Sequence, residues 1–226
     1  MIKYLLFDAD DTLFDFHKCE TTAFNLTCEQ YNLDNSIYAD YYTINQNLWK
    51  MFDSNEITKE KLVVERYIRL FALHKITASP EIFNRDYLAN LGETDYLFDG
   101  AEQLCGDLHK SGKYDMYIIT NGVESTQTAR FNKSAIHGYF RDIFISEKIG
   151  YQKPLKEYFD YVVKTTGIIR EETLIIGDSL SSDIKGGNNA GIRTCWYNPA
   201  DKINTFNYTC DYTIHDLNEL RGILEI

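Results

Sequence analysis

The sequence contains few prolines and no long apolar run. Three of its 226 residues are proline, and no stretch rich in proline, glycine or serine separates two halves, so a second domain is expected to be an insertion. No apolar stretch approaches the roughly 20 residues of a membrane-spanning helix. The N-terminal apolar run, Tyr4–Phe7, is too short for a signal peptide. We therefore expect a cytoplasmic protein without a membrane partner.

Positive charge and paired cysteines are also scarce. Lys and Arg number 23 against 34 Asp and Glu, which gives a formal net charge of −11. So acidic a chain repels the phosphate backbone of nucleic acids, which excludes these polymers as expected partners. The cysteine count is odd and no pair has a metal-ligand spacing, so free thiols in a reducing compartment are expected. The five residues are Cys19, Cys28, Cys105, Cys195 and Cys210.

What the sequence does contain is an alternation of short apolar runs with helical patterns. Loops with small or polar residues follow the runs, and helix-like segments follow most of these loops. This order predicts an α/β fold, a Rossmann-like three-layer core with a parallel sheet between helices. The predicted strands are Tyr4–Phe7, Met116–Ile119, Ile143–Ile145, Leu174–Ile176 and Thr194–Tyr197.

The alternation breaks once, directly after the first predicted strand. Four helical patterns follow one another there without an intervening strand, and Thr58 and Ser79 are placed to cap two of them. We predict a core formed by residues 1–15 and 95–226 and an inserted all-helical domain of residues 16–94. The four helices are predicted at Phe16–Tyr31, Ser36–Phe52, Thr58–His74 and Pro80–Leu91.

Two carboxylates follow the first predicted strand, where an open parallel sheet binds its ligands. Asp8 and Asp10 are two residues apart, so an extended backbone directs both side chains the same way. A solvated loop or a helix cap would also explain them. Like charges this close are costly, however, unless a cation lies between them. Asp11 and Asp15 are expected to serve the turn and the path into the insertion.

Polar residues also follow the later predicted strands. Thr120-Asn121-Gly122 is either a simple turn or a presentation of a hydroxyl and backbone N–H groups to a phosphate. Lys153 alone would be an ordinary surface lysine, and Asp178 and Asp183 could cap a helix that begins near Ser181. If the strands are neighbours, all these groups converge on one crevice.

In this order, the residues resemble the four motifs of the haloacid dehalogenase-like hydrolase superfamily, and the insertion resembles the type-one helical cap of that family. One motif alone would be weak, whereas four in order, each at a strand end or in the following loop, are highly specific. The matching positions are Asp8-Ala9-Asp10-Asp11-Thr12, Thr120, Lys153, Gly177-Asp178 and Asp183.

The resemblance implies Mg²⁺-dependent phosphate-ester hydrolysis through an aspartyl-phosphate. Asp8 would be the nucleophile, and Asp10 would move the protons. Dehalogenase members lack an aspartate at the position of Asp10, since a halide leaves without a proton. Mg²⁺ would be held by the Asp8 carboxylate, the Asp10 backbone carbonyl and Asp178.

The resemblance also assigns supporting roles. Thr120 and the backbone N–H of Asn121 would bind the phosphoryl group, and Lys153 would stabilise its charge on Asp8. Asp183 would hold Lys153 or a metal-bound water, and Thr12 would support the residues that contact the metal and the phosphate without contacting either itself.

A narrower resemblance, to the house-cleaning pyrimidine 5′-nucleotidase branch, rests on SDIKGGNNAGIRTCWYN (Ser182–Asn198) and INQNLWKMF (Ile44–Phe52). It implies a pyrimidine nucleoside monophosphate as the small-molecule substrate. Asn45, Trp49 and Arg66 are then candidates for contacting that substrate, although packing or ion pairing would also explain them. The open alternatives are a phosphatase for a sugar phosphate or phosphoglycolate, a phosphomutase, and a catalytically silent binding module.

Overall fold

The structure is a computed structural model that describes residues 1–226, and the chain divides into two compact units. One unit comprises Met1–Phe16 and Asp95–Ile226, and the other comprises His17–Thr94. The predicted division fell at residues 15/16 and 94/95. No helix is both long and apolar enough to cross a membrane.

The first unit is built on a six-stranded sheet with the order β3-β2-β1-β4-β5-β6, in which every neighbouring pair is parallel. The sequence predicted five of these strands. It missed the sixth, three-residue strand because only one of its residues, Ile214, is fully buried. The bounds are β1 Tyr4–Asp8, β2 Asp115–Thr120, β3 Asp142–Ile145, β4 Thr173–Gly177, β5 Arg193–Tyr197 and β6 Tyr212–Ile214.

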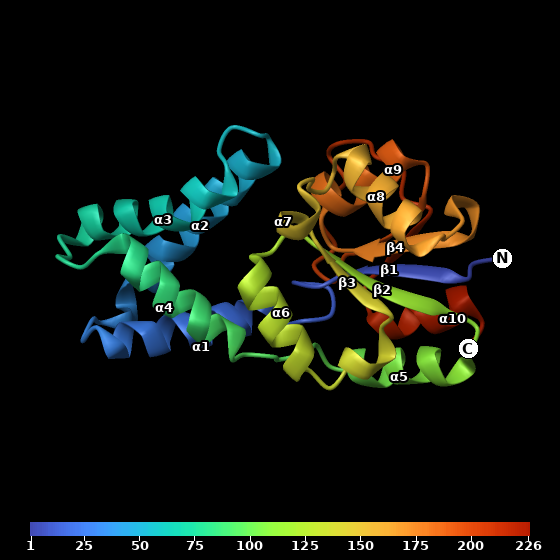
Figure 1. Ribbon diagram of the computed structural model, residues 1–226, viewed down its shortest axis with the longest axis horizontal. Coiled ribbons are helices and arrows are strands. Elements are labelled where there is room, and N and C mark those ends of the chain that lie inside the picture. Colours follow the sequence, from blue (N-terminus) through green and yellow to red (C-terminus); the bar gives the residue numbers. More distant parts are fainter. The chain divides into compact units, whose positions relative to one another are not determined.

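Both faces of the sheet are buried, as a doubly covered parallel sheet requires. Leu5 and Phe7 pack with apolar residues of α5, α6 and α10. Leu6, which points the other way, packs with residues of α8 and α9. Figure 1 shows α8 and α9 on one side of the strands and α5 and α10 on the other. The predicted α/β fold with an inserted helical domain is confirmed.

The helices of this unit are mostly short. The bounds are α5 Ala101–Ser111, α6 Glu124–Lys133, α7 Ser146–Ile149, α8 Lys156–Thr166, α9 Lys185–Ala190 and α10 Leu220–Leu224. A single π-helical turn, Leu180–Ile184, leads from β4 into α9. The close approach of α9 to the sheet depends on Gly187, where a Cβ would overlap Thr194 on β5.

The second unit contains only helices, as predicted. Thr58 and Ser79 cap α3 and α4 as expected, since each hydroxyl accepts a backbone N–H from the first turn. A cluster of buried aromatic rings, which includes Phe24, Tyr41 and Tyr67, joins the helices. The bounds are α1 Phe16–Gln30, α2 Tyr38–Asp53, α3 Lys59–His74 and α4 Pro80–Gly92.

Candidate active site

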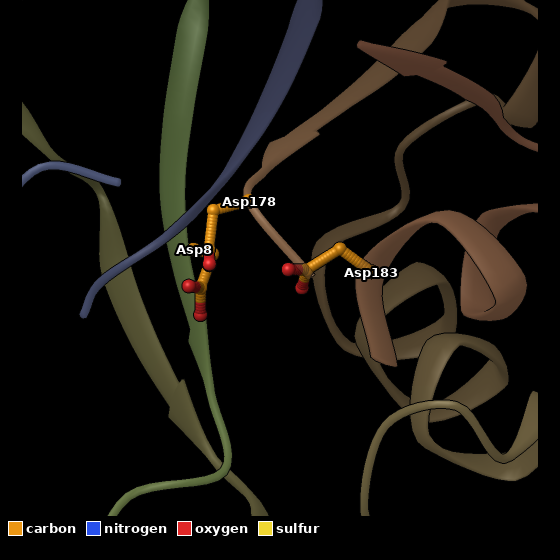
Figure 2. A group of neighbouring side chains, drawn as sticks. All are labelled: Asp8, Asp178 and Asp183. Carbon is orange, nitrogen blue, oxygen red and sulfur yellow. The ribbon is translucent and has the colours of Figure 1, made fainter. Parts of the chain in front are cut away.

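The site lies at the carboxyl ends of β1 and β4, the central neighbours in the sheet. Strands β2 and β3 are added on one side of this pair, and β5 and β6 on the other. The pair is therefore the topological switch point, where open sheets bind ligands. Asp8 ends β1, and Asp178 follows β4 directly. Figure 2 shows Asp8 and Asp178 together, with Asp183 approaching from the following turn. Oxygens of the three carboxylates lie within 4.8 Å of one another.

Lys153 joins two of these carboxylates. Its Nζ donates to Asp8 Oδ1 at 2.6 Å, to Asp183 Oδ1 at 2.7 Å and to the backbone carbonyl of Ile119 at 3.0 Å. The side chain is only 2% exposed, so this is a buried ammonium and not a surface lysine. All three of its N–H donors have partners, and its position is therefore fixed from three directions.

Opposing charges set the pKa of this lysine. Burial alone would lower it, but Asp183 and Asp8 more than offset that effect and raise it well above its usual range. Lys153 is therefore an ammonium at every physiological pH.

Thr12 connects the two strand ends. Its hydroxyl donates to Asp8 Oδ2 at 3.4 Å and accepts the backbone N–H of Asp178 at 3.1 Å. The carbonyl of Asp178 accepts the indole N–H of Trp196 at 2.9 Å. Because these two hydrogen bonds of Asp178 use its backbone, they orient the residue and leave its carboxylate directed at the site.

The segment after β2 is built around Thr120. The Thr120 hydroxyl accepts the N–H of Gly122 at 3.0 Å, so its own proton can still be donated. Its backbone N–H donates at 3.1 Å to Tyr158 Oη, which in turn donates to the carbonyl of Phe144. This chain of bonds fixes Thr120 from two neighbouring elements.

Asn121 has a structural task in the same segment. Its side-chain amide donates to the carbonyl of Lys153 and accepts the N–H of Lys153, each at 2.9 Å. Asn121 therefore fixes the loop that carries the lysine, a function that the sequence did not suggest.

Asp183 is fully buried against Gly177. One carboxylate oxygen accepts from Lys153, and the other accepts the backbone N–H of Ser179 at 3.2 Å. A Cβ at position 177 would overlap the Asp183 carboxylate, so glycine is required there. Of the two tasks expected for Asp183, holding Lys153 is the one observed.

The crowded carboxylates are electrostatically suited to a cation. Burial raises the pKa of Asp8 to about 8, against the lowering effect of Lys153, and Asp183 and Asp10 raise it further. Burial and the charges of Asp8 and Asp183 also hold the pKa of Asp178 well above its usual range. One ammonium does not compensate these acids, and a hard, oxygen-binding ion such as Mg²⁺ fits the donor set.

Asp10 lies in a different environment from Asp8. Arg130 Nη1 donates to Asp10 Oδ1 and Gln127 Nε2 donates to Asp10 Oδ2, each at 2.5 Å. Arg130 is fully buried, with its guanidinium over the rings of Phe14 and Phe16. The two predicted catalytic carboxylates are thus held by separate cations.

Two of the substrate candidates in the helical unit are occupied by a polar network. Asn45 and Arg66 are 1% and 3% exposed. Arg66 donates to Asn45 Oδ1 at 3.2 Å and to Asn84 Oδ1 at 2.8 Å, while Asn45 donates to Glu20 at 2.8 Å. The network uses the polar groups of both side chains, which fits the packing and pairing alternative, and their contact with substrate stays a prediction.

The third candidate, Trp49, is partly buried and packs edge-on against Phe52. Its contact with substrate stays a prediction. Asp11 adopts a left-handed backbone conformation with φ of 60°, and its N–H donates to the carbonyl of Phe14, in keeping with the turn expected there. Asp15 donates its backbone N–H to the carbonyl of Tyr96.

Four residues that position the site were missed by the sequence reasoning: Gln127, Arg130, Tyr158 and Trp196. Gln127 and Arg130 carried the only available signal, since polar residues three apart share one helix face. A polar helix face normally indicates solvent, so that spacing alone could not locate Asp10 beside it.

Comparisons with known proteins agree with this geometry. The family model described as haloacid dehalogenase-like hydrolase matches residues 2–191, and the chain belongs to this family. It is 43% identical to the HAD-hydrolase YfnB of Bacillus subtilis over 98% of this chain and 95% of that protein. A crystal structure of YfnB, described as bound to magnesium and as revealing interdomain movement, matches with a TM-score of 0.93 and covers 100% of this chain and 99% of that one.

Two further relatives have named activities. The chain is 37% identical to pyrimidine 5′-nucleotidase PynA of Streptococcus pneumoniae, over 99% of this chain and 95% of the relative. It is 30% identical to pyrimidine 5′-nucleotidase YjjG of Escherichia coli, over 98% and 97% respectively.

Proposed function

We propose that this hydrolase is a Mg²⁺-dependent phosphomonoesterase, and most specifically a 5′-nucleotidase for pyrimidine nucleoside monophosphates. The observation that carries the proposal is the pair of carboxylates at the end of β1. Asp8 is bound by the Lys153 ammonium, and Asp10 is bound by Arg130 and Gln127. Two acids in unlike environments suit two different roles in one reaction.

In the first half of the reaction, Asp8 attacks phosphorus while Asp10 protonates the ester oxygen that leaves. The P–O ester bond breaks as the Asp8–phosphorus bond forms, which gives an aspartyl-phosphate and an alcohol. Lys153 bridges Asp8 and Asp183, so it faces the negative charge that develops there. The Thr120 hydroxyl, free to donate, and the backbone N–H of Asn121 orient the phosphoryl oxygens.

In the second half, Asp10 takes a proton from the water that attacks phosphorus. The Asp8–phosphorus bond breaks and inorganic phosphate leaves, so both aspartates return to their initial states. An aspartate at position 10 favours an ester over a halide substrate, because a halide needs no proton donor.

Asp8 and Asp178, with the backbone carbonyl of Asp10, are the residues proposed to hold Mg²⁺. When bound, the ion would offset the charge of the carboxylates and of the phosphate oxygens. The proximity of the carboxylate oxygens and the raised pKa of Asp8 support this assignment. The magnesium described for the YfnB structure supports it independently.

The substrate class rests on the relatives and on one aromatic residue. PynA and YjjG are both named as pyrimidine 5′-nucleotidases. Trp49 is the remaining candidate to stack on a base. The helical unit is proposed to determine which substrate binds. The chemistry of Asp8 and Asp10 is the same for nucleotides and for other small phosphate esters.

The test is phosphate release from a panel of nucleoside monophosphates, with Mg²⁺ and with EDTA. Sugar phosphates and phosphoglycolate extend the panel. We expect Mg²⁺-dependent release with the highest kcat/KM for pyrimidine nucleotides, and no turnover by Asp8→Asn. A sugar phosphate with higher kcat/KM would reassign the substrate, and isomerised product with little free phosphate would identify a phosphomutase. If no ester were hydrolysed by a folded protein, the enzymatic proposal would be wrong.

A further inference from the structure

Helix α6 reaches Asp10 with two neighbouring side chains. Gln127 and Arg130 are three residues apart, so they lie one above the other on the same face of the helix. Gln127 Nε2 and Arg130 Nη1 each bind a different oxygen of Asp10, at 2.5 Å. The carboxylate is therefore gripped on both sides, and its rotation about the Cβ–Cγ bond is restricted.

The burial of these two residues indicates a purpose beyond surface charge pairing. Arg130 is 0% exposed and Gln127 is 3% exposed. A buried guanidinium is costly unless its charge is compensated, and the Asp10 carboxylate contributes to that compensation. The arginine is also fixed from outside the pair, since its Cζ lies 4.6 Å from the ring centre of Phe14.

Gln127 also connects Asp10 to the segment proposed to bind phosphate. A Cβ on Gly122 would overlap the Gln127 side chain, which therefore passes directly over this glycine. Gly122 donates its N–H to the Thr120 hydroxyl. The same amide side chain thus packs on the turn that presents Thr120 and binds the predicted proton donor.

We propose that Arg130 and Gln127 are positioning residues that hold the Asp10 carboxylate in the orientation for proton transfer to and from the phosphate ester. This inference rests on the proposed function, because it assumes that Asp10 protonates the leaving oxygen and later deprotonates water. Neither side chain contacts substrate in this account. Their proposed effect on the reaction is exerted through Asp10, which makes it separable from that of Asp8.

The separation uses two esters that differ in their need for a proton. Uridine 5′-monophosphate releases an alkoxide-like ribose oxygen, which needs a proton from Asp10 as the P–O bond breaks. p-Nitrophenyl phosphate releases p-nitrophenolate, which leaves without one. With the second ester, formation of the aspartyl-phosphate needs no proton from Asp10, while its hydrolysis still requires Asp10 to take a proton from water.

The experiment compares Gln127→Ala, Arg130→Met and Arg130→Lys with the unchanged protein in Mg²⁺. We expect Arg130→Met and Gln127→Ala to lower kcat for uridine 5′-monophosphate about 10- to 100-fold, less than the roughly 10²- to 10⁴-fold that proton transfer itself contributes, because Asp10 is still present. KM should change little, and Arg130→Lys should recover part of the loss. With p-nitrophenyl phosphate, the stopped-flow burst should keep its rate within about twofold while the later steady state slows.

Arg141→Gln is the matched control. It removes an exposed Arg–Asp ion pair of the same unit, with Asp115 at 2.9 Å, and should leave both esters unaffected. Thermal unfolding of each variant identifies any that fail to fold. If Arg130→Met fails to fold, Gln127→Ala and Arg130→Lys still test the positioning role, because both keep a buried cation beside Asp10.

Different results overturn the two proposals. No turnover of either ester by the unchanged protein overturns the proposed function, and the positioning role with it. If the unchanged protein is active, a second result overturns only the positioning role. This is a p-nitrophenyl phosphate burst that the variants slow as much as they slow nucleotide turnover. Unchanged or faster nucleotide turnover in the variants also overturns it, since the grip on Asp10 would then be idle or inhibitory.

Discussion

Replacing Lys153 with methionine removes the ammonium between two buried carboxylates. Its Nζ lies 2.6 Å from Asp8 and 2.7 Å from Asp183, and the side chain is 2% exposed. Breaking a buried ion pair by removing one partner costs about 3 to 5 kcal/mol. The carboxylates can avoid part of this cost by taking up protons. We therefore expect Lys153→Met to lower the free energy of unfolding by about 3 kcal/mol at pH 6, the lower end of that range.

The loss should increase with pH, and the sign follows from the groups involved. In the unchanged protein the raised pKa of Lys153 keeps its stabilising charge throughout pH 6 to 8. In the variant, one more buried carboxylate than in the unchanged protein must hold a proton when folded and release it on unfolding, since the compensating ammonium is gone. Each such proton lowers the free energy of unfolding by about 1.4 kcal/mol per pH unit. The difference between variant and unchanged protein should therefore grow by about that amount from pH 6 to pH 7.

Asp8 adds the same slope to both proteins and cancels. Its pKa of about 8 in the fold lies above the ordinary value of 3.8, so its stabilising proton is present at low pH and is lost as pH rises.

The assay is urea unfolding followed by circular dichroism in EDTA, at half-unit steps from pH 6 to pH 7. Lys3→Met is the control, since it removes an exposed lysine that is 2.9 Å from Glu172 and should have little effect at any of these pH values. A loss for Lys153→Met that is constant with pH, or as small as that of the control, would refute the reasoning.

Three further predictions concern the same strand ends. Because the Asp8 pKa is raised to about 8, Mg²⁺ binding at pH 7 should release protons, and the apparent Mg²⁺ affinity should rise with pH up to about 8. Calorimetry in buffers of unequal ionisation enthalpy measures the protons released, and binding without proton release would contradict the prediction. Gly177→Ala should abolish turnover and destabilise the fold by about 1 to 3 kcal/mol, since its Cβ overlaps Asp183, whereas Gly222→Ala, with open space around it, should be harmless in both assays. Trp196→Phe removes the donor to the Asp178 carbonyl and should weaken Mg²⁺ binding about tenfold in the same calorimetry, an effect that would be absent if the indole only packs.

Local pattern was sufficient to predict most of the fold. Strand β1 was predicted at Tyr4–Phe7 and extends one residue further, to Asp8, because the pairing with β2 continues to Ile119. The caps at Thr58 and Ser79 were equally visible, since they depend on residues within one helical turn. Strand β6 was not, because a three-residue edge strand has too little alternation to be recognised.

Some site residues could likewise be predicted from their order along the chain, whereas others depend on tertiary packing. Asp8 and Asp178 stand at the ends of β1 and β4, and Lys153 and Asp183 lie in the segments that follow β3 and β4, so order along the chain is enough to bring them together. Arg130 is different, because its position depends on how α6 packs against the turn after β1. Likewise, the burial of Asn45 and Arg66 with Glu20 and Asn84 depends on helix packing and could not be predicted from the sequence, while their contact with substrate stays a prediction.

The balance of charge explains why the site needs both of its buried cations. Asp8, Asp10, Asp178 and Asp183 contribute four carboxylates, and Lys153 and Arg130 contribute two positive charges. When all these groups are ionised, two negative charges remain, which one divalent cation would offset. A phosphate dianion then adds two more, against which Thr120 and backbone N–H groups supply only dipoles. Under the proposed mechanism, the proton that Asp10 delivers to the leaving oxygen would also relieve part of this excess.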